Sequence, residues 1–250
     1  MSRIPVVYTM GKVASSSVAA AIEGAGLLCH DIHTLNSDYI KGVAKKYLDH
    51  GEFPPRHICV SMAWRERDIL NIRKCLYISL VRDPIARNLS AFFENHKAFL
   101  EGCNFSDLPS ARKVLDNFIN SYPHQLPSRW FDREYRTYLG IDVYKSDFDK
   151  SALFMATDGL IIFRVDLDDR KKSEVLSNAL GRNLKIGRHN DGSRKVYADL
   201  YKAVSKLARF TPDFVDDMYG TPFVQHFWSA DELRSLKSFW LGDDERLGIL

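Results

Sequence analysis

Short apolar runs alternate with amphipathic segments through the first part of this chain. Four runs have the composition of strands, at residues 6–9, 27–32, 58–62 and 76–81. Segments with apolar positions at helical spacing lie between and after them, at residues 16–25, 38–50, 65–71 and 84–100. This repeated β–α order predicts a parallel sheet with right-handed crossovers, flanked by helices.

The rest of the chain is mainly helical by the same criterion. Helical patterns dominate residues 108–139, and one more apolar strand follows at residues 160–164. Four helical segments of the last third lie at residues 171–180, 195–210, 212–219 and 230–240. We therefore expect an α/β fold with a mainly helical C-terminal third. A length of 250 residues with 45% hydrophobic residues fits one domain over residues 1–250, with its helical tail from about residue 195.

The junction between the first strand and the first helix has the composition of a phosphate-binding loop. The apolar run breaks at a glycine, passes a lysine and enters an alanine-rich helix through three serines. N–H groups at a helix N-terminus carry partial positive charge, and small side chains let an anion approach them. Lysine adds a full charge and the hydroxyls add donors. The predicted cradle consists of Gly11, Lys12, Val13, Ala14, Ser15, Ser16 and Ser17.

This loop resembles a Walker A loop in its place but departs from it in sequence. The Walker pattern is G-x-x-x-x-G-K-[ST], whereas Val6 stands at the first glycine position and Val13 follows the lysine. The sheet is therefore expected to be P-loop-like, with a phosphate ligand other than that of an ordinary ATPase.

A second candidate phosphate site follows the run of β-formers at residues 76–81. Arg82 comes directly after this run, Pro84 suits the first turn of the next helix, and Ser90 lies two turns along it. Ligands of open parallel sheets collect at the carboxyl ends of the strands. Arg82 and Ser90 are therefore predicted to contact the same ligand as the glycine–lysine loop.

Together the two segments resemble the sulfotransferase family that uses 3′-phosphoadenosine 5′-phosphosulfate (PAPS). In that family a K-x-x-S-x-S-like loop holds the 5′-phosphosulfate, and an arginine with a serine eight residues later holds the 3′-phosphate. Lys12 to Ser17 match the first element, and Arg82 with Ser90 match the second. The chain is most similar to carbohydrate sulfotransferases of the 2-O type and to bacterial capsular-polysaccharide sulfotransferases, which the segments WFDRE (130–134) and 195–240 resemble.

The resemblance implies transfer of a sulfuryl group from PAPS to a hydroxyl of an acceptor, in the first place a carbohydrate. Lys12 would stabilise the leaving group, because charge develops there in the transition state. In the family, a C-terminal basic segment closes over the nucleotide. Residues 188–195 match it in position, so Arg194 and Lys195 are candidates for the 3′-phosphate.

The acceptor hydroxyl must lose a proton, and histidine has a suitable pKa for taking it near neutrality. Cytosolic sulfotransferases place this histidine on the strand before the arginine strand, where Val60, Ser61 or Met62 stands here. The 2-O enzymes place it just after the second strand, in a segment matched by His30 and His33. His33 would end that strand at the ligand edge and is the first candidate for the base, with His30 the second.

Two other functions stay open. A P-loop-type small-molecule kinase would use the same loop but needs Mg²⁺ ligands, and no acidic set accompanies the loop. A non-catalytic nucleotide-binding partner in polysaccharide assembly would need neither Lys12 nor His33. The sulfotransferase interpretation requires no metal. Trp64 and Trp130 could stack on adenine or a sugar, although such aromatics are more often part of the core.

Composition narrows the possible partners and the compartment. A net charge of +3 is too small to indicate nucleic acid by itself. No stretch approaches the roughly 18 apolar residues of a membrane span, and residues 1–3 lead directly into the first strand. The cysteines have no C-x-x-C spacing, so we expect reduced thiols and a cytoplasmic protein. The acceptor and the oligomeric state are not encoded in any pattern of this sequence.

Overall fold

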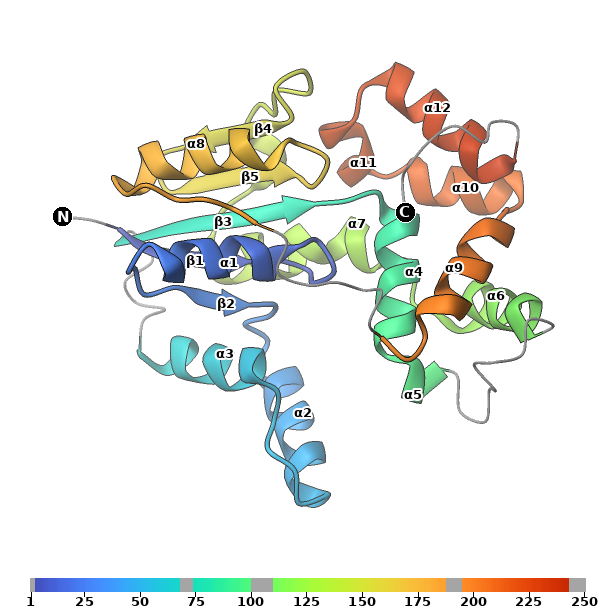
Figure 1. Cartoon of the computed structure of the whole chain (residues 1–250), viewed down its shortest axis with the longest axis horizontal. Helices are drawn as coiled ribbons and strands as arrows, with labels where there is room; N and C mark the ends of the chain where they lie inside the picture. Colours follow the sequence, from blue (N-terminus) through green and yellow to red (C-terminus); the bar gives the residue numbers. More distant parts are fainter. Residues whose placement is uncertain (1–2, 68–73, 100–109, 188–194, 243–250) are drawn as a thin grey trace. The chain divides into compact units, whose positions relative to one another are not determined.

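The computed structural model describes residues 3–67, 74–99, 110–187 and 195–242. Within these ranges, five strands form one sheet in the order β2-β1-β3-β5-β4 (Figure 1). Their bounds are β1 Ile4–Tyr8, β2 His30–Ile32, β3 Cys75–Val81, β4 Phe154–Thr157 and β5 Leu160–Arg164. All neighbours are parallel except β4, which pairs antiparallel with β5 at one edge. The predicted α/β class with a parallel sheet and a helical C-terminal region is confirmed.

The described chain divides into two compact units. The first comprises Met1–Arg82 and Trp130–Asn190, and the second comprises Asp83–Arg129 and Asp191–Leu250. The single domain expected from the length stays a prediction. Within the described residues, no helix combines the length and apolar composition needed to cross a membrane.

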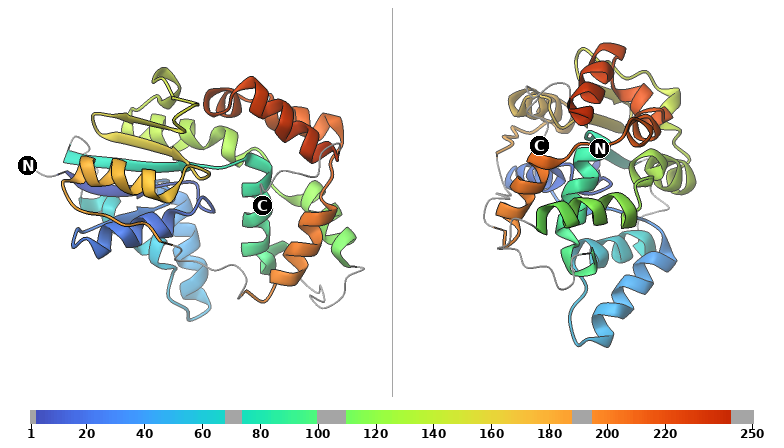
Figure 2. Two further views of the ribbon diagram at one scale, coloured as in Figure 1. Left: turned by 45° about the horizontal axis from the view of Figure 1, so that its top comes forward. Right: turned by 90° about the vertical axis from the view of Figure 1, so that its right-hand side faces the viewer.

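The first unit contains the sheet and the helices packed on it. Its helical segments are α1 Ser15–Gly24, α2 Ser37–Asp49, α3 Arg56–Arg67, the π-helix η2 Asp132–Leu139, the 3₁₀ turn η3 Val143–Lys145 and α8 Asp169–Leu180. α7 Leu126–Phe131 leads into η2. α1 and α8 lie on the same face of the sheet (Figures 1 and 2). Every residue of β3 is buried, as its unbroken run of β-formers predicts.

One predicted strand is wrong. Residues 58–62 belong to α3, in which Ile58, Ser61 and Trp64 are buried at a spacing of three while Cys59 and Met62 are exposed. The segment is helical although its residues favour strands. A helix can bury the single stripe formed by these three residues and leave the others in solvent. The helix predicted at residues 65–71 is the end of α3, and part of it lies outside the described residues.

Other elements differ from expectation at their edges. β2 comprises only the second half of the predicted residues 27–32. Leu28, which precedes the strand, is 72% exposed and so does not take part in the buried sheet. The sequence patterns did not indicate β4 or α11 Pro222–Phe227. Cys29 and Cys75 are buried thiols that form no disulfide, as expected, whereas Cys59 is exposed and Cys103 lies outside the described residues.

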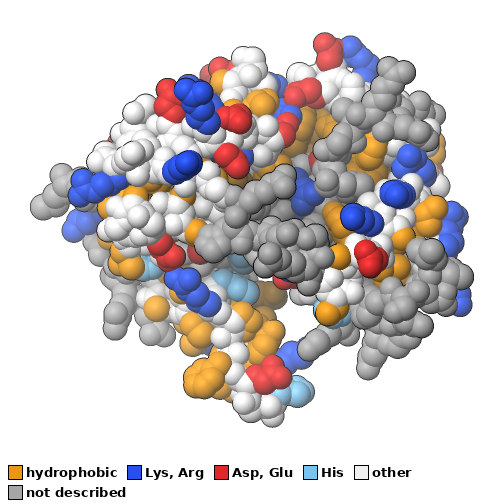
Figure 3. Space-filling model, viewed as in Figure 1, with side chains coloured by type: hydrophobic (Ala, Val, Ile, Leu, Met, Phe, Trp, Pro, Cys, Tyr) orange, Lys and Arg blue, Asp and Glu red, His pale blue; other side chains and the backbone are white. Residues whose placement is uncertain are grey.

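The helix pair α2–α3 has a small hydrophobic cluster of its own. Ile40, Ala44 and Ile58 form it with Val43, while α3 packs on the edge strand β2. Large apolar side chains stay on the surface here, and Figure 3 shows hydrophobic atoms gathered over this part of the molecule. The most exposed are Tyr39, Leu48 and Phe53. Because it buries little apolar area, this pair is the part of the first unit expected to open most easily.

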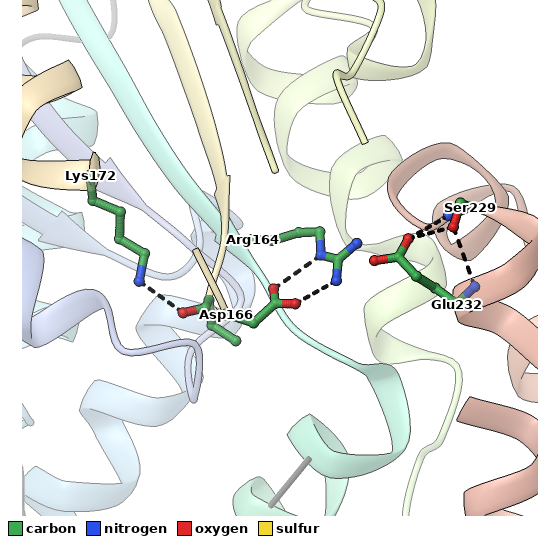
Figure 4. Close-up of polar contacts among 6 residues, drawn as sticks. Arg164, Asp166, Lys172, Ser229 and Glu232 are labelled. Atoms are coloured by element: carbon green, nitrogen blue, oxygen red, sulfur yellow. Dashed lines mark hydrogen bonds and ion pairs between the residues drawn. The ribbon is translucent and has the colours of Figure 1, made fainter. Parts of the chain in front are cut away.

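The second unit is all helical, with α4 Pro84–Glu94 as its most buried helix. The other described helices of this unit are α5 His96–Phe99, α6 Ser110–Ser121, α9 Ala198–Leu207, α10 Pro212–Tyr219, α11 and α12 Ala230–Leu241. Polar side chains of α4 that face inward are satisfied: Arg87 donates to the Tyr122 hydroxyl at 3.1 Å and Asn88 to the His124 carbonyl at 2.9 Å. Ser229 and Glu232 form a capping box at the start of α12 (Figure 4).

We expect a buried carboxylate–phenol pair to be important for the stability of the second unit. Asp83 caps α4 by accepting from the Ala86 N–H at 2.8 Å, and the Tyr219 hydroxyl also donates to it. Tyr219→Phe should lower the free energy of unfolding by about 1–3 kcal/mol, because the buried carboxylate loses a donor. Chemical denaturation measures this loss.

The control is Tyr39→Phe on the exposed face of α2, which should change stability by less than about 0.5 kcal/mol. A double-mutant cycle with Asp83→Ala should be clearly non-additive, since the two side chains contact each other. Additive losses would contradict a coupled pair.

Candidate functional site

The parallel pairing of β1 with β2 and β3 brings the carboxyl ends of the three strands, where the following loops begin, to one edge of the sheet. Tyr8 lies opposite Ile32 of β2, and Val7 lies opposite Ile78 of β3, all in parallel register. The Thr9 N–H continues the ladder to the Ile32 carbonyl at 3.1 Å. The residues that follow these strands, including His33 and Arg82, therefore belong to one edge, where parallel α/β sheets bind ligands.

The loop after β1 has the backbone geometry of an anion cradle. Gly11, Lys12 and Ala14 have φ angles of 74°, 60° and 60°, so three of four consecutive residues are left-handed. Alternation of left- and right-handed residues turns successive N–H groups toward one point, the arrangement called a nest. Left-handed geometry at a lysine and an alanine is uncommon and costs energy, which favours a functional reason for it.

The first turn of α1 completes the cradle. Ala14 is the N-cap and makes no side-chain hydrogen bond to the helix, so the usual serine or aspartate cap is missing from this position. Val13 and Ser15 point into the protein and are buried, whereas Lys12, Ser16 and Ser17 are half-buried. Buried side chains thus anchor the loop while the lysine and two hydroxyls stay accessible. That Gly11 to Ser17 bind a phosphate stays a prediction.

His33 lies directly against this loop. Its Nδ1 is 3.0 Å from the Thr9 carbonyl and 3.3 Å from the Thr9 hydroxyl. Since a carbonyl only accepts, Nδ1 carries the hydrogen and Nε2 keeps its lone pair. A Cβ added to Gly11 would stand 3.7 Å from Cδ2 and 3.8 Å from Nε2 of His33. The imidazole atom able to take a proton is therefore beside the cradle.

Arg82 is the second predicted residue that the structure brings to the loop. Its Nη1 lies 3.5 Å from the Lys12 carbonyl, and its side chain is half-buried. A guanidinium therefore lies at the same edge as the cradle and His33. The pairing of Arg82 with Ser90 around one phosphate stays a prediction, since Ser90 is on α4 in the second unit.

The remaining basic candidates belong to the second unit. Lys195 forms an ion pair with Glu94 at the end of α4, one turn beyond Ser90. The Tyr197 hydroxyl donates to the same carboxylate at 2.5 Å. Ser90 and Lys195 are thus associated with one helix of this unit. Arg194 lies outside the described residues.

A buried carboxylate that the sequence did not indicate supports the loop after β2. Glu134, on η2, is 3% exposed. It accepts from the Tyr8 hydroxyl at 2.5 Å, the Thr34 hydroxyl at 2.8 Å and the Leu35 N–H at 2.8 Å. Burial raises the pKa of the Glu134 carboxyl, while these hydrogen bonds favour its charged form. In a polar segment such as DREY, a glutamate of this kind cannot be distinguished from a surface residue.

Both candidate stacking residues are part of the core. Trp64 is 1% exposed and packs on the His30 ring at 4.8 Å between centroids. Trp130 is 5% exposed, packs on Tyr8 and donates from its indole nitrogen to the His33 carbonyl at 3.3 Å. Neither side chain is placed to stack on a nucleotide, and Trp130 instead supports the residue predicted as the base.

His57 of α3 and Asp31 of β2 are ionisable neighbours of His33. The rings of His33 and His57 are 5.0 Å apart between centroids. Burial, and next the charge of His33, lowers the pKa of His57. Burial raises the pKa of Asp31 to about 6, although the charges of His57 and Arg56 oppose the shift. Burial and the charge of His33 thus both disfavour the protonated form of His57.

The carboxyl end of β5 carries another cation that the sequence analysis did not single out. Arg164 is 4% exposed and donates from Nε to Asp166 Oδ1 at 3.0 Å and from Nη2 to Oδ2 at 2.5 Å (Figure 4). Nearby, Lys172 donates to the Val165 carbonyl at 2.8 Å. These contacts fix the turn after β5 and give Arg164 a structural role.

Two further searches, for a metal site among the described residues and for similar known proteins, gave no result. Among the described residues, no group of three or more His, Cys, Asp or Glu side chains is placed to hold a metal ion. Comparisons with protein-family models, with curated proteins and with solved structures find no match for this chain. The case for a function therefore depends on the loop, Lys12, His33 and Arg82.

The raised pKa of Asp31 predicts a pH-dependent loss of stability. Because the folded pKa of about 6 exceeds the ordinary 3.8, the folded protein binds this proton more tightly than the unfolded chain. The cost of ionising Asp31 is absent below pH 4, grows between pH 4 and 6, and is complete above pH 6. Asp31→Asn should therefore stabilise the protein at pH 7 by on the order of 1–3 kcal/mol.

Urea denaturation at several pH values measures this gain, which should vanish toward pH 4. The exposed Asp147→Asn is the matched control and should give no such dependence. A gain that stays constant with pH would show that it does not come from the ionisation of Asp31.

Proposed function

We propose that this chain is a PAPS-dependent O-sulfotransferase acting on a hydroxyl, in the first place of a carbohydrate. The observation that carries the proposal is the closeness of two predicted parts: the His33 imidazole lies where a side chain at Gly11 would contact it. A phosphate-binding loop alone fits many nucleotide enzymes. A proton acceptor beside the loop is what transfer to a hydroxyl requires.

The loop and Lys12 would hold the 5′-phosphosulfate end of the nucleotide. The left-handed backbone, and an N-cap residue whose side chain makes no capping hydrogen bond, would suit an anion at this position. PAPS supplies the sulfuryl group: a bond from sulfur to the acceptor oxygen forms as the bond to the 5′-phosphate oxygen breaks, which leaves 3′,5′-ADP (PAP). Lys12 would offset the charge that develops on that phosphate oxygen.

His33 would act as the general base. Its Nδ1–H is directed to the Thr9 carbonyl, so Nε2 is the atom that would take the proton of the acceptor hydroxyl. Thr9 thereby sets the tautomer, as an orienting acceptor does for many catalytic histidines. His30 is the weaker candidate, because its ring packs on the buried Trp64.

Arg82 would contribute to recognition of the 3′-phosphate, with Ser90, Arg194 and Lys195 as further candidates. A guanidinium binds phosphate oxygens through two parallel hydrogen bonds, which favours arginine at such a site. A P-loop-type kinase would use the same cradle for ATP, and a non-catalytic nucleotide-binding protein would use it without His33. Nucleotide preference and the effect of replacing His33 separate the three functions.

The first test is nucleotide preference. PAP should raise the melting temperature more than ATP with Mg²⁺ does at the same concentration, because the tighter ligand stabilises the native state more. A ligand at 100 times its Kd stabilises that state by about 2.7 kcal/mol. Calorimetry should also show that wild type prefers PAP to 5′-AMP and that Arg82→Ala loses most of this preference. Arg112→Ala, an exposed arginine paired with Asp116, is the control and should leave both affinities unchanged.

An equal response to PAP and to ATP with Mg²⁺ would favour the kinase. Equal losses of PAP and 5′-AMP binding in Arg82→Ala would mean that Arg82 supports the loop through the Lys12 carbonyl, with no part in recognising the 3′-phosphate.

The second test concerns the base. His33→Ala should lower the kcat of sulfate transfer by about 10²–10⁴-fold while PAP affinity stays close to wild type. Wild type should lose kcat/KM at acid pH as the base is protonated, and the variant should lack this limb. His50→Ala, at the exposed end of α2, is the matched control. If His33→Ala keeps its activity and pH profile while His30→Ala loses both, the assignment passes to His30.

A further inference from the structure

We propose that Glu134 is the positioning residue of the candidate base, and that it sets the place of His33 relative to the phosphate-binding loop. The inference rests on the proposed function, because it assigns a role in that reaction to a residue outside the ligand site. Glu134 is buried and belongs to η2, far from His33 in the sequence. It acts through its neighbours, without contact to a substrate.

The segment that follows His33 is held by Glu134. Thr34 donates its hydroxyl to Oε1, and Leu35 donates its N–H to Oε2, both at 2.8 Å. The Asn36 N–H donates in turn to the Thr34 hydroxyl at 3.0 Å. His33 itself is fixed at its carbonyl by the Trp130 indole and at Nδ1 by Thr9. The imidazole is thus held by the bonds of His33 itself to Trp130 and Thr9, and the chain that follows it is held by Glu134.

The same carboxylate also holds the end of β1. The Tyr8 hydroxyl donates to Oε2, and the adjacent Tyr135 donates its hydroxyl to the Tyr8 carbonyl at 3.0 Å. Tyr8 immediately precedes Thr9, the partner of His33, and is three residues before Gly11, the first residue of the loop. Glu134 therefore joins the end of the strand that begins the cradle to the segment that carries the base.

A carboxylate is the right group to hold the end of β1 and the segment after β2 together. An ionised carboxylate only accepts hydrogen bonds, and the three groups from Tyr8, Thr34 and Leu35 all donate. Burial of Tyr8, and next the charge of Glu134, raises the pKa of this phenol well above its ordinary value, so it stays a donor. η2 is π-helical, a form that is rare and often occurs at functional sites.

The experiment compares Glu134→Ala with Glu134→Gln. Alanine removes all three hydrogen bonds. Glutamine keeps an oxygen for Tyr8 and Leu35, and its amide can donate to the Thr34 hydroxyl, so it should restore the geometry. The ring ¹⁵N spectrum of His33 reports the tautomer and needs no turnover. Wild type and Glu134→Gln should show the Nδ1–H form, and Glu134→Ala a mixture of both tautomers.

Turnover provides the second readout. Glu134→Ala should lower kcat by on the order of 10²-fold, since a small misplacement of a reacting group has an effect of this size. Its KM for PAPS should stay within a few-fold of wild type, and Glu134→Gln should recover most of kcat. Thr34→Val removes the two hydrogen bonds of the Thr34 hydroxyl, to Glu134 and from the Asn36 N–H, and keeps the Tyr8 and Leu35 bonds to Glu134. It is therefore the variant to use if Glu134→Ala does not fold. Thr34→Val should shift the tautomer in the same direction.

Asp168→Ala is the matched control. The Asp168 carboxylate accepts hydrogen bonds from two backbone N–H groups at the start of α8, so this variant loses comparable bonds in another part of the chain. It should lower the melting temperature and leave the tautomer and kcat unchanged. If Glu134→Ala behaves as Asp168→Ala does, Glu134 is structural only and the inference is overturned. Absence of sulfate transfer in wild type would refute the proposed function, while the ¹⁵N spectra would still decide whether Glu134 positions His33.

Discussion

Strand β1 pairs in parallel with β2 on one side and with β3 on the other, and the candidate site depends on this pairing. Parallel register brings the ends of the three strands to one edge, so Thr9, His33 and Arg82 become neighbours although they are far apart in the sequence. The contact between His33 and Thr9 continues the β1–β2 ladder by one residue. A shift of register by one residue would turn this imidazole to the other face.

The loop from Gly11 to Ser17 adopts a conformation that has an energetic cost. Left-handed geometry at non-glycine residues costs roughly 1–2 kcal/mol each, and Lys12 and Ala14 both adopt it. Burial of Val13 and Ser15 on either side of Ala14 helps to hold this conformation. Under the proposed function, a loop already held in this conformation would lose less entropy when the anion binds.

Buried carboxylates organise both compact units, each in the same way. In the first unit Glu134 gathers donors from β1 and from the segment after β2. In the second unit Asp83 caps α4 and accepts from the Tyr219 hydroxyl. Each carboxylate is stable inside the protein because hydrogen bonds replace the water that burial removes. Such residues specify where elements meet, and removing one partner leaves the other unsatisfied.

Local patterns determined the α/β class, the fully buried strand β3, the loop from Gly11 to Ser17 and the place of His33 after β2, because all of these follow from residues adjacent in the chain. Tertiary structure decided the rest. Residues 58–62 have β-forming side chains but form part of α3, since only one helical stripe can be buried there. Trp130 and Glu134 lie about a hundred residues from His33 in the sequence, and only folding brings them to it. A glutamate in a polar segment gives no sign that it will be buried, because its partners come from other strands and loops.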